Sequence, residues 1–182
     1  MNLIKTKLDG LVLLKPTIIK DNRGYFMESY HQKNIKKLIG NVSFVQDNES
    51  ESSRGVLRGL HFQMPPYAQA KLVRCLKGSV LDVALDLRKD SKTYGCFKTT
   101  LLSEENKSQL FIPNGFAHGF VVLSETAIFS YKVDNYYNPD SESGILWNDP
   151  DLKIDWKIPK DEIIISEKDN NLPTFNNINN PF

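Results

Sequence analysis

The sequence has little cysteine, little histidine and no long apolar run. Its two cysteines, Cys75 and Cys96, cannot form a disulfide framework, and we expect both to be reduced, small core residues. No apolar run approaches the roughly 18 residues that span a bilayer, so we expect no membrane partner. The opening MNLIKTKLDG lacks the apolar core of a signal peptide, so a cytoplasmic location is expected.

The sequence also lacks an excess of charge of either sign. Its 23 Lys and Arg residues nearly balance its 22 Asp and Glu residues, which gives a net charge of +1. This balance argues against a nucleic-acid partner bound by bulk charge, although a local cationic pocket remains compatible with it. A chain of 182 residues with no evident linker fits one domain, residues 1–182.

Motifs for common cofactors and nucleophiles are absent as well. The chain has no GxSxG, GxGxxG or P-loop sequence, and His31, His61 and His118 are not spaced as HxH, HxxxH or HExxH. A metal site would require His61 and His118 to converge with a carboxylate. We therefore predict neither metal nor cofactor.

The sequence predicts a mostly β protein. Residues 71–76 and 80–87 flank Lys77-Gly78-Ser79 and predict a hairpin, and residues 119–123 and 126–133 predict another. Asp82 and Asp86 fall on one face of the predicted strand and Val83, Leu85 and Leu87 on the other, an alternation typical of a half-buried strand. Residues 32–39 carry a helical pattern closed by Gly40, and the polar NESESSRG stretch is expected to be a loop. After residue 138 the chain becomes irregular. Short strands between regular turns predict a sandwich or barrel.

Three side chains in these predicted strands could carry chemistry. Alternation puts His61 of RGVLRGLHFQ on one face with Leu57, Gly59 and Gln63, where two glycines leave room for a ligand; a core histidine is the slightly favoured alternative. Lys71 falls in an apolar row, which is unusual for lysine unless it is paired or reaches solvent. Tyr131 also falls in an apolar row, where a structural role is more usual.

Taken together, the motifs resemble the dTDP-4-dehydrorhamnose 3,5-epimerase family. The matching segments occur in the family's order over about residues 20–156 and include DNRGYFMESY, FVQDNES, RGLHFQMPPYAQAKLVR, IPNGFAHGF and YKVDNYYNPDSESGILWNDP. The resemblance implies an all-β, cupin-like jelly-roll sandwich or barrel with short peripheral helices. It also implies an isomerase without metal or redox cofactor. Phe62 stands where the family often has tyrosine, and the last ten or so residues match nothing recognisable.

The resemblance implies a reaction and roles for individual residues. The substrate would be dTDP-4-dehydro-6-deoxy-D-glucose, epimerised at C3 and C5 to dTDP-4-dehydro-L-rhamnose through an enolate. His61 would be the base, Tyr131 the acid and Asp169 the partner that orients His61, while Lys71 and Arg58 would hold the substrate and offset charge at the reacting carbonyl. His118 would line the pocket. The nucleotide would be bound by Arg23, Glu28, Gln46, Asp47, Asn48, Glu142 and Lys168, with Tyr137 stacked on thymine.

The resemblance further implies a homodimer whose nucleotide site is shared between subunits, and a place in the synthesis of rhamnose-containing surface polysaccharide such as lipopolysaccharide. Three alternatives stay open at this point. A relative could epimerise only C3 or C5 of a related dTDP-4-keto sugar. A non-catalytic cupin could bind a sugar nucleotide, although it would need neither His61 nor Tyr131. A metal-dependent cupin would bind iron, zinc or manganese.

Overall fold

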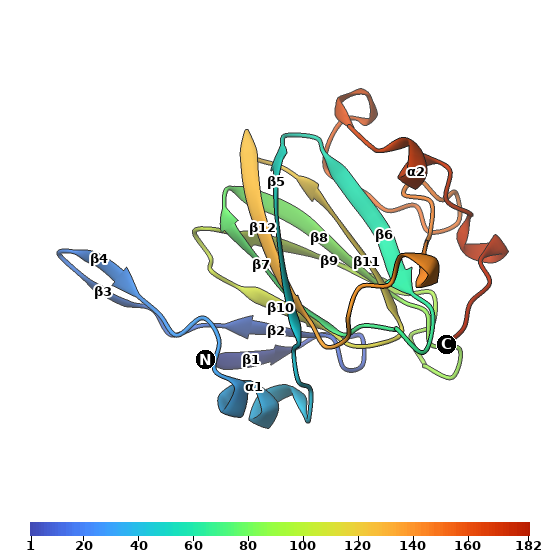
Figure 1. The fold of residues 1–182 in the computed structure, drawn as a ribbon. Coiled ribbons are helices and arrows are strands. Elements are labelled where there is room, and N and C mark those ends of the chain that lie inside the picture. The colour runs from blue at the N-terminus through green and yellow to red at the C-terminus, as the bar shows by residue number, and fades with distance from the viewer.

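The computed structural model describes residues 1–182 and consists of two β-sheets that face each other (Figure 1). One sheet has six strands in the order β1-β2-β10-β7-β12-β5, and the other has five in the order β13-β6-β11-β8-β9. A separate hairpin, β3-β4, projects from the body of the molecule (Figure 1). The expected all-β jelly-roll sandwich with short peripheral helices is confirmed. No helix is both long enough and apolar enough to cross a membrane.

The elements have the following bounds. The six-stranded sheet comprises β1 (Asn2–Lys5), β2 (Val12–Lys15), β10 (Gln109–Ile112), β7 (Lys71–Lys77), β12 (Thr126–Val133) and β5 (Gln46–Ser53). The five-stranded sheet comprises β13 (Glu142–Gly144), β6 (Leu57–Gln63), β11 (Phe116–Val122), β8 (Ser79–Asp86) and β9 (Phe97–Ser103). The remaining elements are β3 (Ile19–Asp21), β4 (Gly24–Phe26), α1 (Gln32–Ile39), α2 (Glu167–Asn170) and short 3-10 turns at Pro139–Ser141, Lys160–Glu162 and Phe175–Asn177.

Apolar side chains form three layers. The layer between the sheets draws on both of them and includes the stacked rings of Phe120 and Phe129, whose centroids are 4.2 Å apart. The outer face of the five-stranded sheet is covered by the irregular C-terminal segment, anchored by Trp147 and Trp156. The outer face of the six-stranded sheet packs against α1 through Ile35. Both sheets are therefore supported from behind, and the site lies between them.

Both predicted hairpins are wrong. β7 and β8 lie in different sheets, as do β11 and β12, so each intervening turn carries the chain from one sheet to the other. β7 pairs with β10 and β12, and β8 pairs with β9 and β11. Two apolar runs around a turn predict that the chain reverses, but they do not specify the hydrogen-bonding partner of each strand.

Several local predictions can be compared with the structure. α1 spans the predicted residues 32–39, with the side chain of His31 accepting the N–H of Asn34 at its start. The predicted NESESSRG loop is mostly strand β5; this edge strand presents polar side chains on both faces and so lacks an apolar signature. β8 is buried on both faces rather than one, because the C-terminal segment covers its outer side. Cys75 is buried as expected, whereas Cys96 is exposed.

The backbones of β6 and β11 approach each other closely at two glycines. A Cβ at Gly119 would lie 2.7 Å from the carbonyl oxygen of Arg58 and 3.2 Å from the Cα of Gly59. The backbone of Gly59 has φ +114°, in the region that favours glycine. This contact sets the spacing of the strands that carry His61 and His118.

We therefore expect Gly119→Ala to lower the free energy of unfolding by about 3 kcal/mol, because backbone atoms must move to admit the methyl group. Thermal denaturation followed by circular dichroism measures the change. Gly40→Ala is the control, since a Cβ there meets nothing within 4 Å and only its φ of +91° opposes the substitution. Equal melting temperatures for wild type and Gly119→Ala would contradict the proposed strand contact.

Candidate active site between the two sheets

A cavity of about 520 Å³ lies between the sheets and is lined by both. An adjoining cavity of about 300 Å³ shares His61, Lys71, Tyr131 and Glu142 with it. Together they form one continuous candidate site. The residues predicted from the sequence that line it are Arg58, His61, Lys71, His118, Tyr131, Glu142, Lys168 and Asp169 in the larger part, and Gln46, Asn48 and Tyr137 in the smaller part.

β6 supplies both Arg58 and His61, and an irregularity in the strand brings them to the same cavity. Opposite β11, His61 pairs with His118 and Arg58 pairs with Phe120, so the two β6 residues between these pairs stand opposite a single residue of β11. The prediction that strict alternation groups Leu57 with His61 is therefore wrong. Leu57 packs in the layer under the C-terminal segment, and Arg58 takes its place beside the histidine.

The imidazole of His61 is held by a carboxylate from α2. His61 Nε2 lies 2.7 Å from Asp169 Oδ1, while Asp169 Oδ2 accepts the N–H of Gly59 at 3.1 Å. Although burial acts to raise the pKa of Asp169, these hydrogen bonds hold it below its ordinary value. The carboxylate accepts a hydrogen bond from Nε2–H, so in the neutral ring the lone pair lies on Nδ1. His61 is thus arranged to act as a base through Nδ1.

The position of Asp169 follows from the local sequence. Ser166 caps α2, and its side-chain oxygen accepts the N–H of Asp169 at 3.1 Å. The same helix brings Lys168 to the cavity. The SEKD sequence therefore places a carboxylate and an ammonium group at one rim.

Tyr131 and Lys71 come from the opposite wall. They lie on β12 and β7, which are neighbours in the six-stranded sheet, whereas His61 belongs to the five-stranded sheet. Burial raises the pKa of Tyr131, although Arg58 opposes the shift, so the phenol stays protonated at neutral pH. Burial lowers the pKa of Lys71 to about 8, and the charges of Asp82 and Glu142 oppose the change. A base and a phenol therefore face the cavity from different sheets.

A second histidine–carboxylate pair lies deeper. His118 Nε2 is 2.8 Å from Asp82 Oδ2, and both side chains are buried. Burial lowers the pKa of His118 despite the nearby Asp82, so its imidazole is neutral at neutral pH. The sequence pattern predicts the strand that holds Asp82 but gives its carboxylate no role. Its one available signal was an aspartate inside an apolar run, a feature that it shares with Asp86.

Glu142 gathers two partners at the rim of the smaller cavity. Lys168 Nζ donates to Glu142 Oε2 at 2.6 Å, and the Tyr137 hydroxyl donates to the same oxygen at 2.7 Å. Burial acts to raise the pKa of Glu142, but these two hydrogen bonds hold it below its ordinary value. The three residues leave the ring of Tyr137 largely exposed, as a flat surface for an aromatic ligand group.

Three predicted nucleotide residues do not line these cavities. Asp47 points to the other face of β5, where it pairs with Lys132 at 2.7 Å. Arg23 sits in the turn of the β3-β4 hairpin and pairs with Asp21 at 2.6 Å. Glu28, just after the hairpin, accepts a hydrogen bond from Asn34 at 3.1 Å.

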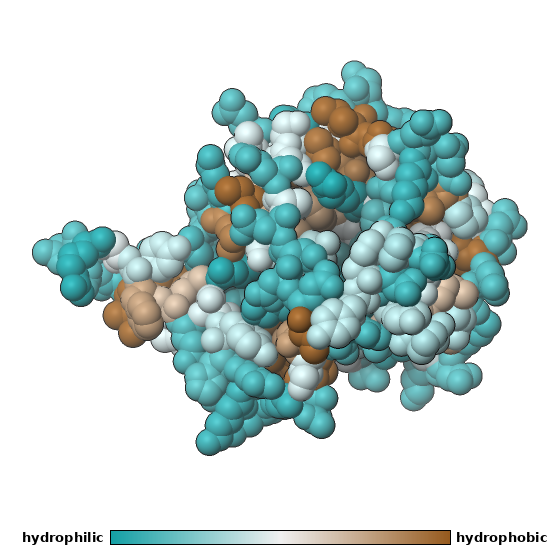
Figure 2. Space-filling model, viewed as in Figure 1, coloured by the Kyte–Doolittle hydropathy of each residue, from teal (hydrophilic) through white to brown (hydrophobic).

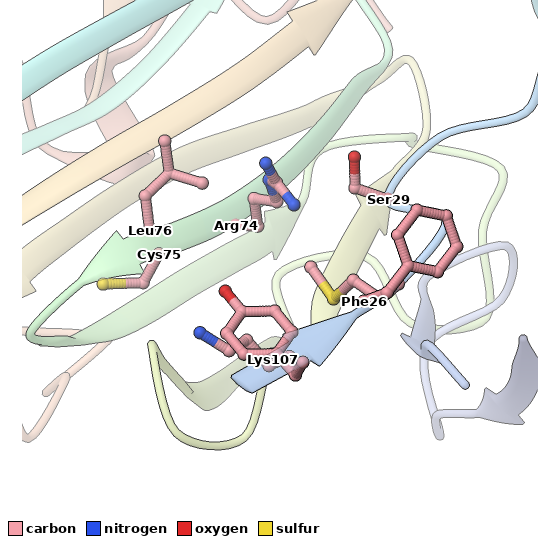
Figure 3. Close-up of a pocket in the computed structure, with 8 residues that line it drawn as sticks. Phe26, Ser29, Arg74, Cys75, Leu76 and Lys107 are labelled. Carbon is pink, nitrogen blue, oxygen red and sulfur yellow. The ribbon is translucent and has the colours of Figure 1, made fainter. Parts of the chain in front are cut away.

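A separate pocket of about 330 Å³ lies where the hairpin meets β7 (Figure 3). Its labelled residues include Phe26, Ser29, Arg74 and Lys107, and it contains no histidine or carboxylate. It therefore lacks the histidine–carboxylate pairs of the site between the sheets. Its place at the root of the hairpin associates it with the packing of that segment.

The side chains of this site are not arranged as a metal centre. No group of three or more His, Cys, Asp or Glu side chains is placed to hold an ion. His61 and His118 face each other across β6 and β11, but each ring is bonded to its own aspartate. The donor set suits proton transfer, because each ring has one nitrogen held by a carboxylate.

Comparison with known proteins agrees with this arrangement. The sequence model described as dTDP-4-dehydrorhamnose 3,5-epimerase matches residues 5–177. A curated protein of that name from Shigella flexneri is 52% identical, with 96% of each chain covered. A more distant relative from Streptomyces niveus, 37% identical over 93% of this chain and 81% of its own, is named dTDP-4-dehydrorhamnose 3-epimerase.

Solved structures show the same likeness. The dTDP-4-dehydrorhamnose 3,5-epimerase of Elizabethkingia anophelis superposes with a TM-score of 0.93 at 56% identity, covering 97% of each chain. The Legionella pneumophila enzyme, solved in complex with dTDP-4-keto-L-rhamnose, has a TM-score of 0.93 at 47% identity, covering 97% of this chain and 94% of its own. With a matching family model, close relatives and a matching fold over nearly its whole length, the chain belongs to the dTDP-4-dehydrorhamnose 3,5-epimerase family.

Proposed function

We propose that this protein epimerises dTDP-4-dehydro-6-deoxy-D-glucose at C3 and C5 to give dTDP-4-dehydro-L-rhamnose. The observation that carries the proposal is the placement of His61 and Tyr131 on opposite walls of one cavity. Inversion at carbon requires a proton to leave one face of the sugar ring and to return to the other. A base on one sheet and an acid on the other supply that geometry.

The first step is proton removal by His61. C3 and C5 both flank the C4 ketone, so their protons are the acidic ones. The Nδ1 lone pair takes the proton, and the Asp169 carboxylate stabilises the resulting imidazolium through Nε2–H. The electrons left on carbon move toward O4 and form an enolate.

The second step returns a proton from the opposite wall. The phenol of Tyr131 is protonated at neutral pH and can donate to the enolate carbon, after which O4 becomes a ketone again. Repeating the two steps at the other carbon completes the double inversion. Proton exchange with water resets His61 and Tyr131 between rounds.

Lys71 and Arg58 would stabilise the enolate. Both are cationic side chains on the cavity wall, and negative charge at O4 develops only as the proton leaves. Their attraction is therefore stronger in the transition state than in the ground state, which raises the rate as well as the affinity. His118, a neutral imidazole beside them, would contribute a polar contact to the sugar.

The smaller cavity is suited to the nucleotide. Tyr137 offers a ring on which thymine could stack, and Gln46 and Asn48 offer amide groups for its polar edge. Gln46 and Asn48 are themselves joined by a 2.9 Å hydrogen bond, which holds their side chains in place. Lys168 supplies positive charge near the site of the diphosphate, and Glu142 orients both Lys168 and Tyr137.

We further propose that the protein is a homodimer in which the β3-β4 hairpin completes the partner's nucleotide site. A two-stranded hairpin is marginally stable alone, yet this one exposes Ile19 by 62% and Phe26 by 69%. Figure 2 shows apolar residues on this projection. Arg23, Asp47 and Glu28 do not line this chain's own cavity, and a partner's hairpin would bring Arg23 and Glu28 to it. A cytoplasmic location stays a prediction from the sequence.

The proposed function is tested by incubation with dTDP-4-dehydro-6-deoxy-D-glucose in D2O, followed by NMR and mass spectrometry. Wild type should place deuterium at both C3 and C5, and His61→Ala should exchange at least about 10³-fold more slowly because the base is gone. His31→Ala, which alters an exposed histidine at the start of α1, is the matched control. Deuterium at one carbon only would assign the chain to the single-carbon epimerases, of which the Streptomyces niveus relative is one by name. No exchange would overturn the proposal.

Tyr131→Phe should separate the two steps. Loss of the hydroxyl removes the acid but leaves His61 and Asp169 intact, so epimerised product should fall by about 10²-fold while solvent exchange at the abstracted position persists. The ratio of exchange to inversion, read from the same NMR spectra, measures the effect. Unchanged formation of product would exclude Tyr131 as the acid.

The dimer is tested by mixing two defective variants. Arg23→Ala lacks the hairpin cation and His61→Ala lacks the base, so each alone should be nearly inactive. After unfolding and refolding together, half of the dimers would be mixed and would hold one intact site of two, restoring about one quarter of the wild-type rate. Sedimentation checks the oligomeric state. A fully active monomer, or no recovery from refolded dimers, would contradict a shared site.

A further inference from the structure

The ammonium group of Lys71 makes no hydrogen bond or ion pair with any other group of the chain. It sits on β7 with its side chain turned toward the space between the sheets, in the same row as Val73 and Cys75 of the apolar core. It lines both parts of the cavity. A lysine drawn out of water without a partner tends to lose its proton. Its charge must therefore be maintained by groups that do not touch it.

One carboxylate oxygen of Asp82, on β8, has no hydrogen-bond partner. The side chain is fully buried, and Oδ2 is bonded to His118. Oδ1 is buried and has no hydrogen-bond partner, a condition shared by one other side-chain atom, the Oγ1 of Thr100. A buried acceptor with no partner is costly, so such a group calls for an explanation.

We propose that Asp82 is a positioning residue for the epimerase reaction, whose carboxylate is the fixed countercharge that keeps the Lys71 ammonium protonated and directed into the cavity. The inference rests on the function proposed above. Asp82 does not touch the substrate in this account, and it acts through Lys71. Its bond to His118 fixes the carboxylate in place.

The charges around Lys71 single out Asp82. The titratable and charged groups that line the cavity with it are Arg58 and His61 on β6, His118 on β11, Tyr131 on β12 and Glu142 on β13. Asp82 on β8, bonded to His118, lies in the row of Val80 and Ala84, which packs in the same layer between the sheets as Val73 and Cys75 of the Lys71 row, and its charge acts on Lys71 from there. Two of these six are carboxylates. Lys168 and Asp169, on α2, are engaged with Glu142 and His61 respectively.

Glu142 is the weaker candidate because its charge is already satisfied. It accepts from the Lys168 ammonium group at 2.6 Å and from the Tyr137 hydroxyl at 2.7 Å. The partner of Asp82 is an imidazole that burial keeps neutral, so it leaves the carboxylate charge uncompensated. Asp82 also lies in the interior, where water screens its field least. Asp82 therefore stabilises the protonated form of Lys71 more than Glu142 does.

Asp82→Asn tests the proposal with little change in shape. The amide oxygen still accepts from His118, and Thr100, directly opposite on β9, offers an oxygen for the new N–H group. The negative charge is lost, so the pKa of Lys71 should fall from about 8 by a further half to one unit. Protonated Lys71 is the active form, so the alkaline limb of kcat should move to lower pH by the same amount. A pH–rate profile measures this shift.

Two controls separate this role from a structural one. Asp149→Asn removes an equally buried carboxylate that binds backbone N–H groups in the C-terminal segment, so it should lower the melting temperature but leave the alkaline limb in place. In a Lys71→Gln background, Asp82→Asn should cause no further loss of rate, because its effect passes through Lys71. An alkaline limb that stays in place in Asp82→Asn would overturn the proposal.

A measurement without substrate keeps this test independent of the proposed function. Protein labelled with 13C at lysine Cε is titrated by NMR, and the Lys71 signal is identified by its absence in Lys71→Gln. A lower midpoint in Asp82→Asn supports the countercharge even if wild type fails to epimerise the sugar, and an unmoved midpoint refutes it. If Asp82→Asn alone does not fold, the double variant with Lys71→Gln should melt above Lys71→Gln, because no buried charge is left unbalanced. A lower melting temperature for the double variant would also refute the proposal.

Discussion

The hydrogen bond between His61 and Asp169 joins two parts of the chain that are 108 residues apart in sequence, and the site depends on it. Through Asp169 it ties the C-terminal segment to β6, and the same carboxylate also accepts the N–H of Gly59 beside the close contact of β6 and β11. The segment that covers the outer face of the five-stranded sheet therefore also sets the orientation of His61, the proposed base. The candidate site is therefore complete only when this irregular segment is docked on the sheet.

The charges between the sheets follow from the reaction that the cavity would perform. An enolate needs positive charge at one point, and in a narrow site that charge must come from side chains that have left water. Desolvation acts against a charged lysine, so a cation at this depth requires a fixed anion nearby. The space between the sheets therefore has two parts. The stacked rings of Phe120 and Phe129 fill one part, and ionisable groups line the other. His118 lies at the boundary, stacked on Phe129 and bonded to Asp82.

How much the sequence could predict differs between levels of structure. The β class, α1 and strand β6 follow from local pattern, because periodicity and capping act within a few residues. The two predicted hairpins were wrong because the pairing of strands depends on contacts between residues distant in sequence. Alternation alone did not predict that Arg58 lines the same cavity as His61, because one irregularity in β6 reverses the alternation of side chains. Asp82 was placed in the correct strand but not recognised, since its importance depends on Lys71 from the facing sheet. Local pattern singled out His61, Lys71 and Tyr131 as candidates, whereas their roles and the remaining site residues came from resemblance, which carries tertiary information that pattern lacks.

The proposed base and acid would serve a single and a double epimerase alike, so we expect the choice between the two reactions to lie in how the sugar moves. C3 and C5 flank C4 on either side, and both enolates place their charge on the same O4. A fixed cation such as Lys71 can therefore serve both reactions if the ring turns about the C4–O4 direction while O4 stays in place. His61 is held in place by its hydrogen bond to Asp169, and Tyr131 is held by strand β12. The sugar must therefore be the part that turns. The space around these three side chains, rather than their identity, then decides whether one carbon or two are inverted.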